Sequence, residues 1–311
     1  MKIVFFGTSG FAIPILEALV KNNIPPALVV TTPDKPQGRG AKIKAPPVKV
    51  WAEIQKLPVI QPQEFKIENL KLKIENADLF IVASYGKIIP KDLLNIPKYG
   101  AINVHPSLLP KYRGPSPIQT AILNGDKEAG VTIMLMDEEM DHGPIVVNSK
   151  FKIQSSKLTY IELEQELADL GANLLIETIP DWVAGKIKPE EQNHDEAVYT
   201  KKVAKEDGHI NWHEPAEVIE RKIRAYLPNP GTFTFYKTSA RTLRLKIIAA
   251  EVTPRPSEIA DGEVFRTAKS FAVGTSDGAL EIIKIQPDGK DEMPAAAFLN
   301  GHQKIIGALL S

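Results

Sequence analysis

Three polar residues whose side chains can stabilise or transfer charge stand at the ends of two apolar runs. Asn103 and His105 lie in AINVHPSLLPKYRGPSP, residues 101–117, and Asp141 follows the apolar run VTIML within MDEEMDHGPIV. Alternation along a strand would place Asn103 and His105 on one side of it. Such a set suits attack of a weak nucleophile on a carbonyl. The amide and the imidazole can donate to the developing oxyanion, and the carboxylate can orient the imidazole or take the nucleophile's proton.

Taken singly, each of these residues is equally typical of ordinary structure. An Asn or Asp beside Pro or Gly commonly forms a turn, and an isolated His is more often structural than catalytic. Two other kinds of site are disfavoured. A hydrolase triad of Ser107, His105 and Asp141 would lack the G-x-S-x-G elbow around its serine. The six histidines are scattered without HExxH spacing, so no metal site is expected.

The composition indicates a two-domain globular protein. Its 311 residues can bury a substantial core, and its 38 basic and 38 acidic residues give zero formal net charge, so nucleic-acid contacts would depend on local basic patches. The absence of cysteine excludes disulfides and thiolate zinc sites, and it fits a reducing, cytoplasmic location. No run reaches the roughly 20 apolar residues of a membrane span, and the N-terminal run meets GTSG too early for a signal peptide.

The elements that would carry the three residues begin with a βαβ pattern. Residues 2–6 form a buried strand, a helix follows through about Leu19, and 27–31 form the next strand. This opening predicts the α/β class, with a doubly wound, mostly parallel sheet of Rossmann type whose ligands bind at the carboxyl ends of its strands. GTSG lacks the three-glycine spacing of a dinucleotide site, so no NAD is expected.

The C-terminal third of the chain predicts a second domain. Short β-rich runs with turn signals follow one another from residue 232 to residue 285, which suggests a small barrel. The polar stretch KIKPEEQNHDEAVYTKKVAK marks the boundary. We therefore expect a catalytic domain at 1–184, a linker at 185–206 and the barrel at 207–311. Arg221 and Arg224 belong to a basic cluster near the start of the barrel, which suits either a solvated face or nucleic acid.

The segment 32–47, TPDKPQGRGAKIKAPP, is a long insertion after the second strand, and its prolines and glycines are expected to preclude regular structure. Against one carboxylate it carries four cations: Lys35, Arg39, Lys42 and Lys44. Loops of this kind are usually functional or disordered. A solvated surface loop and a phosphate-binding loop are therefore equally good interpretations of the residues alone.

The motifs INVHPSLLPKYRGPSPIQ and GVTIM-MD-MDHGPI resemble the signature of the folate-dependent formyltransferases. Nearly from end to end, the chain resembles the methionyl-tRNA formyltransferase branch of that family. The resemblance implies Asn103, His105 and Asp141 as catalytic residues and an OB-like C-terminal barrel. It implies 10-formyltetrahydrofolate as the formyl donor and methionyl-initiator tRNA as the acceptor, with no metal and no membrane partner. The basic insertion at 32–47 would then enter the acceptor arm, with Arg39 and Lys42 as its best phosphate or base contacts.

The resemblance also implies the folate contacts. One loop would wrap the pterin ring, although from sequence it is equally an ordinary β-to-α connection; its residues are Tyr85, Gly86, Lys87, Ile88 and Ile89. The SLLP segment would contact the folate through Ser107, Leu108, Leu109 and Pro110. Arg113 just beyond it is expected at a solvated rim, or as a cation for the folate's glutamate tail or a tRNA phosphate.

Two alternatives remain at this stage. A formyltransferase acting on an amino sugar nucleotide would share the catalytic motif and the barrel, but it would not need the basic PDKPQGRGAK insertion. A non-catalytic module that binds RNA or folate would not need intact Asn103, His105 and Asp141. The protein is expected to act as a monomer.

Overall fold

The computed structural model describes residues 1–37, 42–63, 74–155, 157–239 and 241–311 of the chain. These residues divide into two compact units. Unit 1 comprises Met1–Pro117, Lys127–Gln154 and Leu163–Lys201. Unit 2 comprises Ile118–Asp126, Ser155–Glu162 and Lys202–Ser311. Both units are therefore assembled from segments that are not contiguous in sequence.

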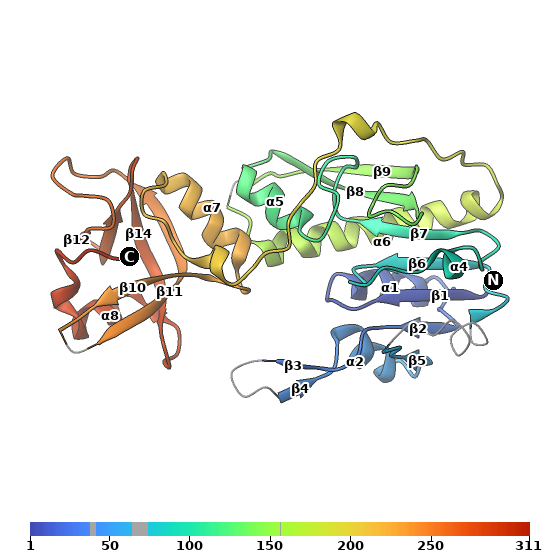
Figure 1. Cartoon of the computed structure of the whole chain (residues 1–311), viewed down its shortest axis with the longest axis horizontal. Coiled ribbons are helices and arrows are strands. Elements are labelled where there is room, and N and C mark those ends of the chain that lie inside the picture. The colour runs from blue at the N-terminus through green and yellow to red at the C-terminus, as the bar shows by residue number, and fades with distance from the viewer. Residues whose placement is uncertain (38–41, 64–73, 156, 240) are drawn as a thin grey trace. The chain divides into compact units, whose positions relative to one another are not determined.

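Unit 1 is built on a seven-stranded sheet with the order β5-β2-β1-β6-β7-β8-β9 (Figure 1). Strands β1, β2, β5, β6 and β7 are parallel, whereas β8 and β9 are antiparallel additions. The strand bounds are β1 Ile3–Gly7, β2 Leu28–Val30, β5 Val59–Ile60, β6 Leu79–Ala83, β7 Ala101–His105, β8 Glu128–Leu135 and β9 Ile145–Lys152. The chain builds outward from β1 in one direction and then from β6 in the other, so the topological switch point lies between β1 and β6.

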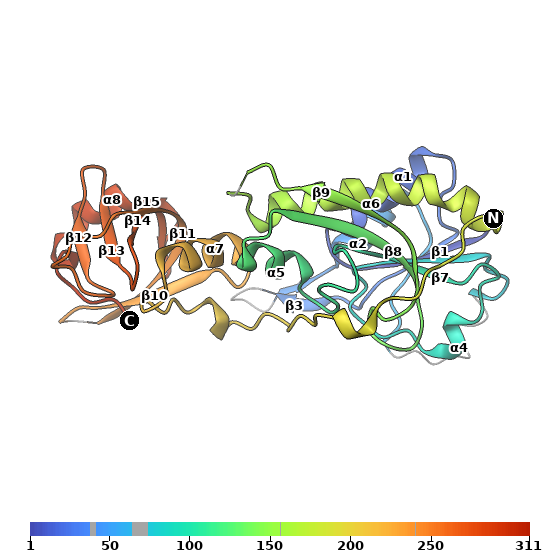
Figure 2. The same ribbon diagram turned by 90° about the horizontal axis from the view of Figure 1, so that it is seen from above.

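Helices cover this sheet and explain its continuous apolar strands. Every residue of β1, β6 and β7 is buried, as expected of strands with both faces covered. Figure 2 shows α1 and α6 along the same face of the sheet. Gly171 in α6 permits close packing, because a Cβ there would lie 2.8 Å from the Cγ1 of Val104 in β7. Among the described residues of unit 1, α-helices are formed by α1 Ala12–Lys21, α2 Pro47–Ile54, α4 Lys91–Leu94 and α6 Tyr160–Val183, the last of which begins in unit 2.

The basic insertion is partly regular, contrary to the expectation that its prolines and glycines preclude regular structure. Strand β3, Lys35–Gln37, pairs antiparallel with β4, Lys42–Lys44, and Pro36 faces Ile43. A proline is tolerated there because alternate residues of a two-stranded ribbon direct their backbone nitrogen away from the partner. Asp34 anchors the base of this hairpin: its carboxylate accepts bonds from Gln61 Nε2 at 2.6 Å and Lys49 Nζ at 2.9 Å. These bonds, that of Gln61 first, hold the pKa of Asp34 below its usual range.

The segment expected as a linker at 185–206 is packed onto unit 1 through Lys201. Glu190 forms an isolated bridge with Ile145, and Tyr199 forms one with Arg113. Gln192 and Thr200 are buried, with exposed fractions of 4% and 8%. These two polar side chains are thus held within unit 1, whereas most of the other polar side chains of the segment are exposed.

Unit 2 contains a closed antiparallel barrel. Its strands follow the order β10-β11-β14-β13-β12, with β15 paired to β14. Residues 308–311 bond to β10 through Phe235 and to β12 through Val264, which joins the two edges of this sheet. The elements are η2 Glu206–Gly208, α7 Ala216–Tyr226, β10 Thr232–Lys237, β11 Thr242–Thr253, β12 Val264–Arg266, β13 Phe271–Gly274, β14 Ala279–Pro287, β15 Met293–Pro294, α8 Ala295–Gly301 and η3 Gln303–Ile305, together with α5 Pro117–Asn124.

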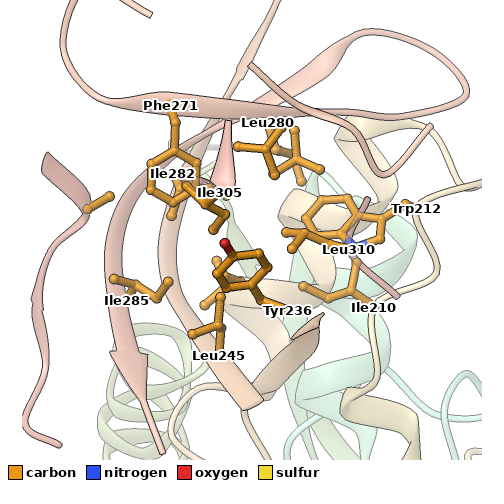
Figure 3. Close-up of a cluster of buried hydrophobic side chains, with 14 of the residues drawn as sticks. Ile210, Trp212, Tyr236, Leu245, Phe271, Leu280, Ile282, Ile285, Ile305 and Leu310 are labelled. Carbon is orange, nitrogen blue, oxygen red and sulfur yellow. The ribbon is translucent and has the colours of Figure 1, made fainter. Parts of the chain in front are cut away.

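The barrel has its own hydrophobic core. Trp212, Tyr236, Phe271 and Leu280 converge in its interior with aliphatic residues from several strands (Figure 3). Trp212 Nε1 donates to Thr234 Oγ1 at 3.0 Å, so the buried indole is also satisfied. The expected fold class, a mostly parallel α/β sheet followed by a small β-barrel domain, is confirmed. Within the described part of the chain, none of the helices combines the length and apolar character needed to cross a membrane.

Candidate active site

The three residues identified from sequence meet beside β7, an inner strand of the unit 1 sheet. Asn103 and His105 lie at the carboxyl end of β7, with exposed fractions of 9% and 4%, and Asp141 lies in the turn between β8 and β9. Asn103 Nδ2 donates to Asp141 Oδ1 at 3.3 Å. His105 Nδ1 lies 3.5 Å from the same oxygen. An amide, an imidazole and a carboxylate therefore converge, as strand alternation and the turn position had predicted.

The carboxylate of Asp141 is fixed on its other side as well. Its Oδ2 accepts a bond from the backbone N–H of Gly114 at 2.8 Å. Gly114 has a φ of +106°, and a Cβ there would lie 2.9 Å from Thr200 Oγ1. Position 114, whose N–H donates to Asp141, therefore requires glycine. Asp141 itself adopts a left-handed φ of 52°. The backbone on both sides of this bond thus takes conformations that few residues accept.

The ring of His105 has a defined orientation. Its Nε2 lies 3.0 Å from the carbonyl oxygen of Tyr112. A carbonyl oxygen only accepts hydrogen bonds, so Nε2 carries a hydrogen, and Nδ1 is the nitrogen that faces Asp141. A neutral His105 presents a lone pair at Nδ1, whereas an imidazolium presents an N–H there beside the carboxylate.

The SLLP segment is held rigidly next to this trio. Thr132 Oγ1 donates to the carbonyl of Ser107 at 2.7 Å and accepts from the N–H of Leu109 at 3.1 Å. Ser107 Oγ donates to the carbonyl of Lys111 at 2.6 Å. Because this hydroxyl hydrogen is used within the loop, Ser107 is not directed at His105 as a triad nucleophile would be. The Leu108 side chain packs directly on Gly130, because a Cβ built on Gly130 would lie only 2.4 Å from Leu108 Cδ2.

The expected pterin loop divides into buried and exposed side chains. Tyr85 and Ile89 are core residues, each with an exposed fraction of 2%, whereas the Ile88 side chain is 81% exposed. Burial raises the pKa of the Tyr85 phenol. Gly86 has a φ of +76° with no atom within 4 Å of a built Cβ, and Lys87 Nζ donates to the carbonyl of Pro62 at 2.9 Å. The loop can therefore offer backbone groups and the side chain of Ile88 to a ligand.

The expected tRNA contacts are distributed over both units. Lys35 and Lys44 are exposed in the hairpin of unit 1, and Lys42 lies in β4. Arg39 lies outside the described residues. In unit 2, Arg221 Nε donates to the carbonyl of Leu123 at 2.9 Å.

Arg224 in unit 2 is more fully engaged than Arg221. It binds the Glu220 carboxylate at 2.7 and 2.9 Å and donates to the carbonyl of Leu158 at 2.7 Å. These two arginines thus tie α7 to α5 and to the segment 155–162.

Sequence reasoning missed a second group of polar residues at the site. Arg113, expected at a solvated rim, has an exposed fraction of 1% and bonds to Gln192, His194 and Tyr199. Gln192 in turn bonds to the carbonyls of Asp141 and Gly143. These partners lie about 80 residues apart along the chain and sit in a stretch whose composition is that of a linker, so no spacing signal connects them. Across the described ranges, no group of three or more His, Cys, Asp or Glu residues is arranged to hold a metal ion.

The chain matches two family models. Residues 1–179 match a model described as formyl transferase, and residues 202–303 match one described as formyl transferase, C-terminal domain. The chain is 43% identical over 303 residues to a protein named methionyl-tRNA formyltransferase from Thermodesulfovibrio yellowstonii, covering 97% of this chain and 96% of that one. A protein of the same name from Caldanaerobacter subterraneus is 41% identical, with full coverage of both chains.

Solved structures agree in fold at low sequence identity. HypX from Aquifex aeolicus in complex with tetrahydrofolic acid superposes with a TM-score of 0.66 at 19% identity, covering 98% of this chain and 48% of HypX. An N-formyltransferase from Helicobacter canadensis, in complex with folinic acid and dTDP-3-aminofucose, gives a TM-score of 0.65 at 22% identity, covering 91% of this chain and 99% of that one. With both family models matched and full-length relatives above 40% identity, the chain belongs to the formyl transferase family.

Proposed function

We propose that this protein transfers the formyl group of 10-formyltetrahydrofolate to the α-amino group of methionyl-initiator tRNA. The observation that carries the proposal is the convergence of Asn103, His105 and Asp141 in a chain whose full-length relatives carry the name methionyl-tRNA formyltransferase. A cytoplasmic location and action as a monomer belong to the proposal as expectations from sequence.

The proposed reaction begins with the unprotonated amine. Its lone pair attacks the formyl carbon, a C–N bond forms, and the carbonyl electrons move to the oxygen. The tetrahedral intermediate then collapses and breaks the bond between the formyl carbon and the folate nitrogen. One proton leaves the attacking nitrogen, and one is gained by the departing folate nitrogen.

The residues have distinct parts in this scheme. Asn103 Nδ2 carries two hydrogens and gives one to Asp141, which leaves the other for the oxyanion. His105 donates to the same oxyanion from Nδ1 when it is an imidazolium, because its other ring nitrogen is occupied by the Tyr112 carbonyl. Asp141 receives the amine's proton. Its bonds to Asn103 and Gly114 hold the carboxylate in one orientation for that transfer.

The folate is proposed to bind along two loops beside the trio. The segment 107–110 supplies one wall, stiffened by Thr132. The loop 85–89 supplies the other, through the backbone at Gly86 and Lys87 and the exposed side chain of Ile88. Tyr85 and Ile89 support this loop from the core and need not touch the ligand.

The tRNA is proposed to contact cations of both units. In unit 1 these are the hairpin residues Lys35, Lys42 and Lys44, together with Arg39. In unit 2, Arg221 and Arg224 remain the contacts expected from sequence, but their guanidinium groups already serve intramolecular bonds. The exposed residues Lys237 and Arg244 are better placed, because Arg244 stacks over the Phe233 ring at 3.8 Å and so forms an aromatic and cationic surface suited to RNA.

One experiment separates the acceptors. The protein is incubated with a labelled 10-formyl donor and either methionyl-tRNA or an amino sugar nucleotide such as dTDP-3-aminofucose. Label is expected on methionyl-tRNA alone. Label on the sugar would establish the alternative, and failure to label either acceptor would favour a non-catalytic module.

A further inference from the structure

The buried guanidinium of Arg113 is satisfied by neutral groups. Its Nε and Nη2 donate to Gln192 Oε1 at 3.1 and 2.7 Å, and its Nη1 donates to the Tyr199 hydroxyl at 3.1 Å. Nη2 also lies 2.8 Å from His194 Nδ1. Arginine only donates, so His194 accepts through an unprotonated Nδ1. The residue is therefore committed to the segment 192–199 and not to a ligand.

These bonds determine which way Gln192 faces. Its Oε1 must point at the guanidinium, so its Nε2 points the other way, where it donates to the carbonyls of Asp141 at 3.0 Å and Gly143 at 2.7 Å. The reverse orientation would set an amide N–H₂ against a donor-only guanidinium and an oxygen against two carbonyls. Arg113 thus selects the orientation in which Gln192 clamps the catalytic turn.

The clamped turn is one that needs support. Asp141 has a left-handed φ of 52°. The backbone at Gly143 lies so close to β8 that a Cβ there would be 2.0 Å from the carbonyl oxygen of Leu135. A second contact reaches the same turn: the rings of His142 and His194 stack at 4.1 Å with an interplanar angle of 2°. His142 Nδ1 lies 2.6 Å from Asp137 Oδ2 at the start of the turn. Residues after α6 therefore contact the turn at two points, through the hydrogen bonds of Gln192 and through the ring of His194.

We propose that Gln192, oriented by Arg113, is a positioning residue of the active site that holds the Asp141 carboxylate in register with Asn103 and His105. Residues 192–199 then belong to the catalytic machinery and do not merely connect two domains. Gln192 touches no reacting atom. It acts through the backbone of Asp141, and the kinetic test of this inference rests on the proposed formyl transfer.

The informative substitution is Gln192→Glu. A carboxylate keeps the acceptor for Arg113, so the buried guanidinium stays paired, but it removes both donors to the carbonyls of Asp141 and Gly143. We expect kcat for methionyl-tRNA to fall about 10–100-fold, the loss typical of a small displacement of a catalytic group, with the KM for both substrates nearly unchanged. Arg113→Lys, which cannot orient Gln192 through two nitrogens, is expected to give the same pattern.

A matched control is Gln165→Glu, because Gln165 makes a surface bond to Asp169 on α6. It should leave kcat and KM unchanged. A readout that needs no turnover is the amide resonance of Gly114, whose N–H donates to Asp141 Oδ2 at 2.8 Å. In Gln192→Glu this resonance should shift upfield and its hydrogen exchange should accelerate, because the carboxylate has moved.

The outcomes separate the two proposals. A Gln192→Glu protein with wild-type kcat and an unchanged Gly114 amide would overturn the positioning role. So would a lowered melting temperature accompanied by full kcat per folded molecule, because that is the signature of a purely structural residue. If the wild-type protein does not formylate methionyl-tRNA, the proposed function fails, and the Gly114 amide still decides whether Gln192 positions Asp141.

Discussion

The bond between His105 Nε2 and the Tyr112 carbonyl shows how one main-chain atom sets the chemistry of a side chain. With Nε2 so occupied, every proton that His105 gains or loses in the reaction passes through Nδ1, 3.5 Å from Asp141. Asp141 therefore serves both the imidazole and the amide of Asn103. Its charge is the property on which the proposed mechanism most depends.

The substitution Asp141→Asn tests that dependence directly. An asparagine keeps the size of the side chain but cannot take the amine's proton. We expect kcat to fall about 10²–10⁴-fold, the usual contribution of a positioned acid or base, while folate binding and the melting temperature are retained. The measurement is single-turnover formyl transfer with saturating donor. Activity within a few-fold of wild type would remove Asp141 from the mechanism.

The contrast between the three proposed catalytic residues and Gln192, which supports them, shows which residues local sequence rules can identify. Two local rules predicted that these side chains lie close together: the period of two along a strand for Asn103 and His105, and the Gly-Pro turn after a strand for Asp141. The resemblance to the formyltransferases supplied their expected catalytic role. Gln192 had no such rule, since its partners at 113 and 141 are close only in the folded chain. A glutamine in a run of charged residues carries no local signal of burial.

Among the elements, α7 acts as a connector within unit 2. Arg224, whose side chain is 13% exposed, joins Glu220 to the carbonyl of Leu158, and Arg221 reaches the carbonyl of Leu123 at the end of α5. Contacts of this kind compete with a role in tRNA binding, because a guanidinium that satisfies buried acceptors is not free for a phosphate. The sequence shows the basic cluster, but it gives no means of assigning these partners.

Arg224→Gln distinguishes the two roles. The change leaves the Glu220 carboxylate and the Leu158 carbonyl without their donor, so we expect unfolding to become easier by about 1–3 kcal/mol. The affinity of the folded protein for tRNA should be unchanged. Chemical denaturation and a tRNA titration measure the two quantities. A weaker, less salt-dependent affinity at unchanged stability would instead make Arg224 a phosphate contact.

For the hairpin β3–β4, in contrast to Arg224, we expect substitutions of basic residues to weaken tRNA binding. Lys35 and Lys44 are exposed and face each other in register, and like charges placed directly opposite destabilise a strand pair. A phosphate bound between them would offset that repulsion. We expect the double substitution Lys35→Ala and Lys44→Ala to weaken tRNA binding and to lower the slope of log K against log salt by roughly 0.7–0.9 for each phosphate that is no longer neutralised.

The control for this experiment keeps the net charge equal. Lys21 and Lys152 are exposed lysines of unit 1 outside the hairpin, and their joint replacement by Ala should leave the salt slope unchanged. The KM for the folate donor should be unaffected in both proteins. Equal slopes for the hairpin and control variants would reduce the hairpin to a solvated connection and would remove the main sequence argument against a sugar acceptor.

For the whole molecule, composition predicted two domains with contiguous ranges, whereas the folded chain divides into interleaved units. Segments 118–126 and 155–162 group with the barrel, and residues 185–201 group with the sheet. The reason is that a few specific bonds, such as those of Arg221 to Leu123 and of Gln192 to Asp141, bring distant segments together. The average polarity of a stretch of sequence gives no information about bonds between residues that are distant along the chain.

Two truncated proteins test whether residues 185–201 function as part of unit 1. One ends after Ala184, where the catalytic domain was expected to end, and the other ends after Lys201, where unit 1 ends. Both lack α7 and the barrel, so both should need more methionyl-tRNA for half-saturation, and their comparison isolates residues 185–201. Only the longer protein keeps the bonds of Gln192 and Tyr199 to Arg113. Its kcat should therefore exceed that of the shorter protein by about 10–100-fold. Folate binding and near-ultraviolet circular dichroism serve as folding controls, and equal kcat values in two folded proteins would show that the catalytic turn holds its shape unaided.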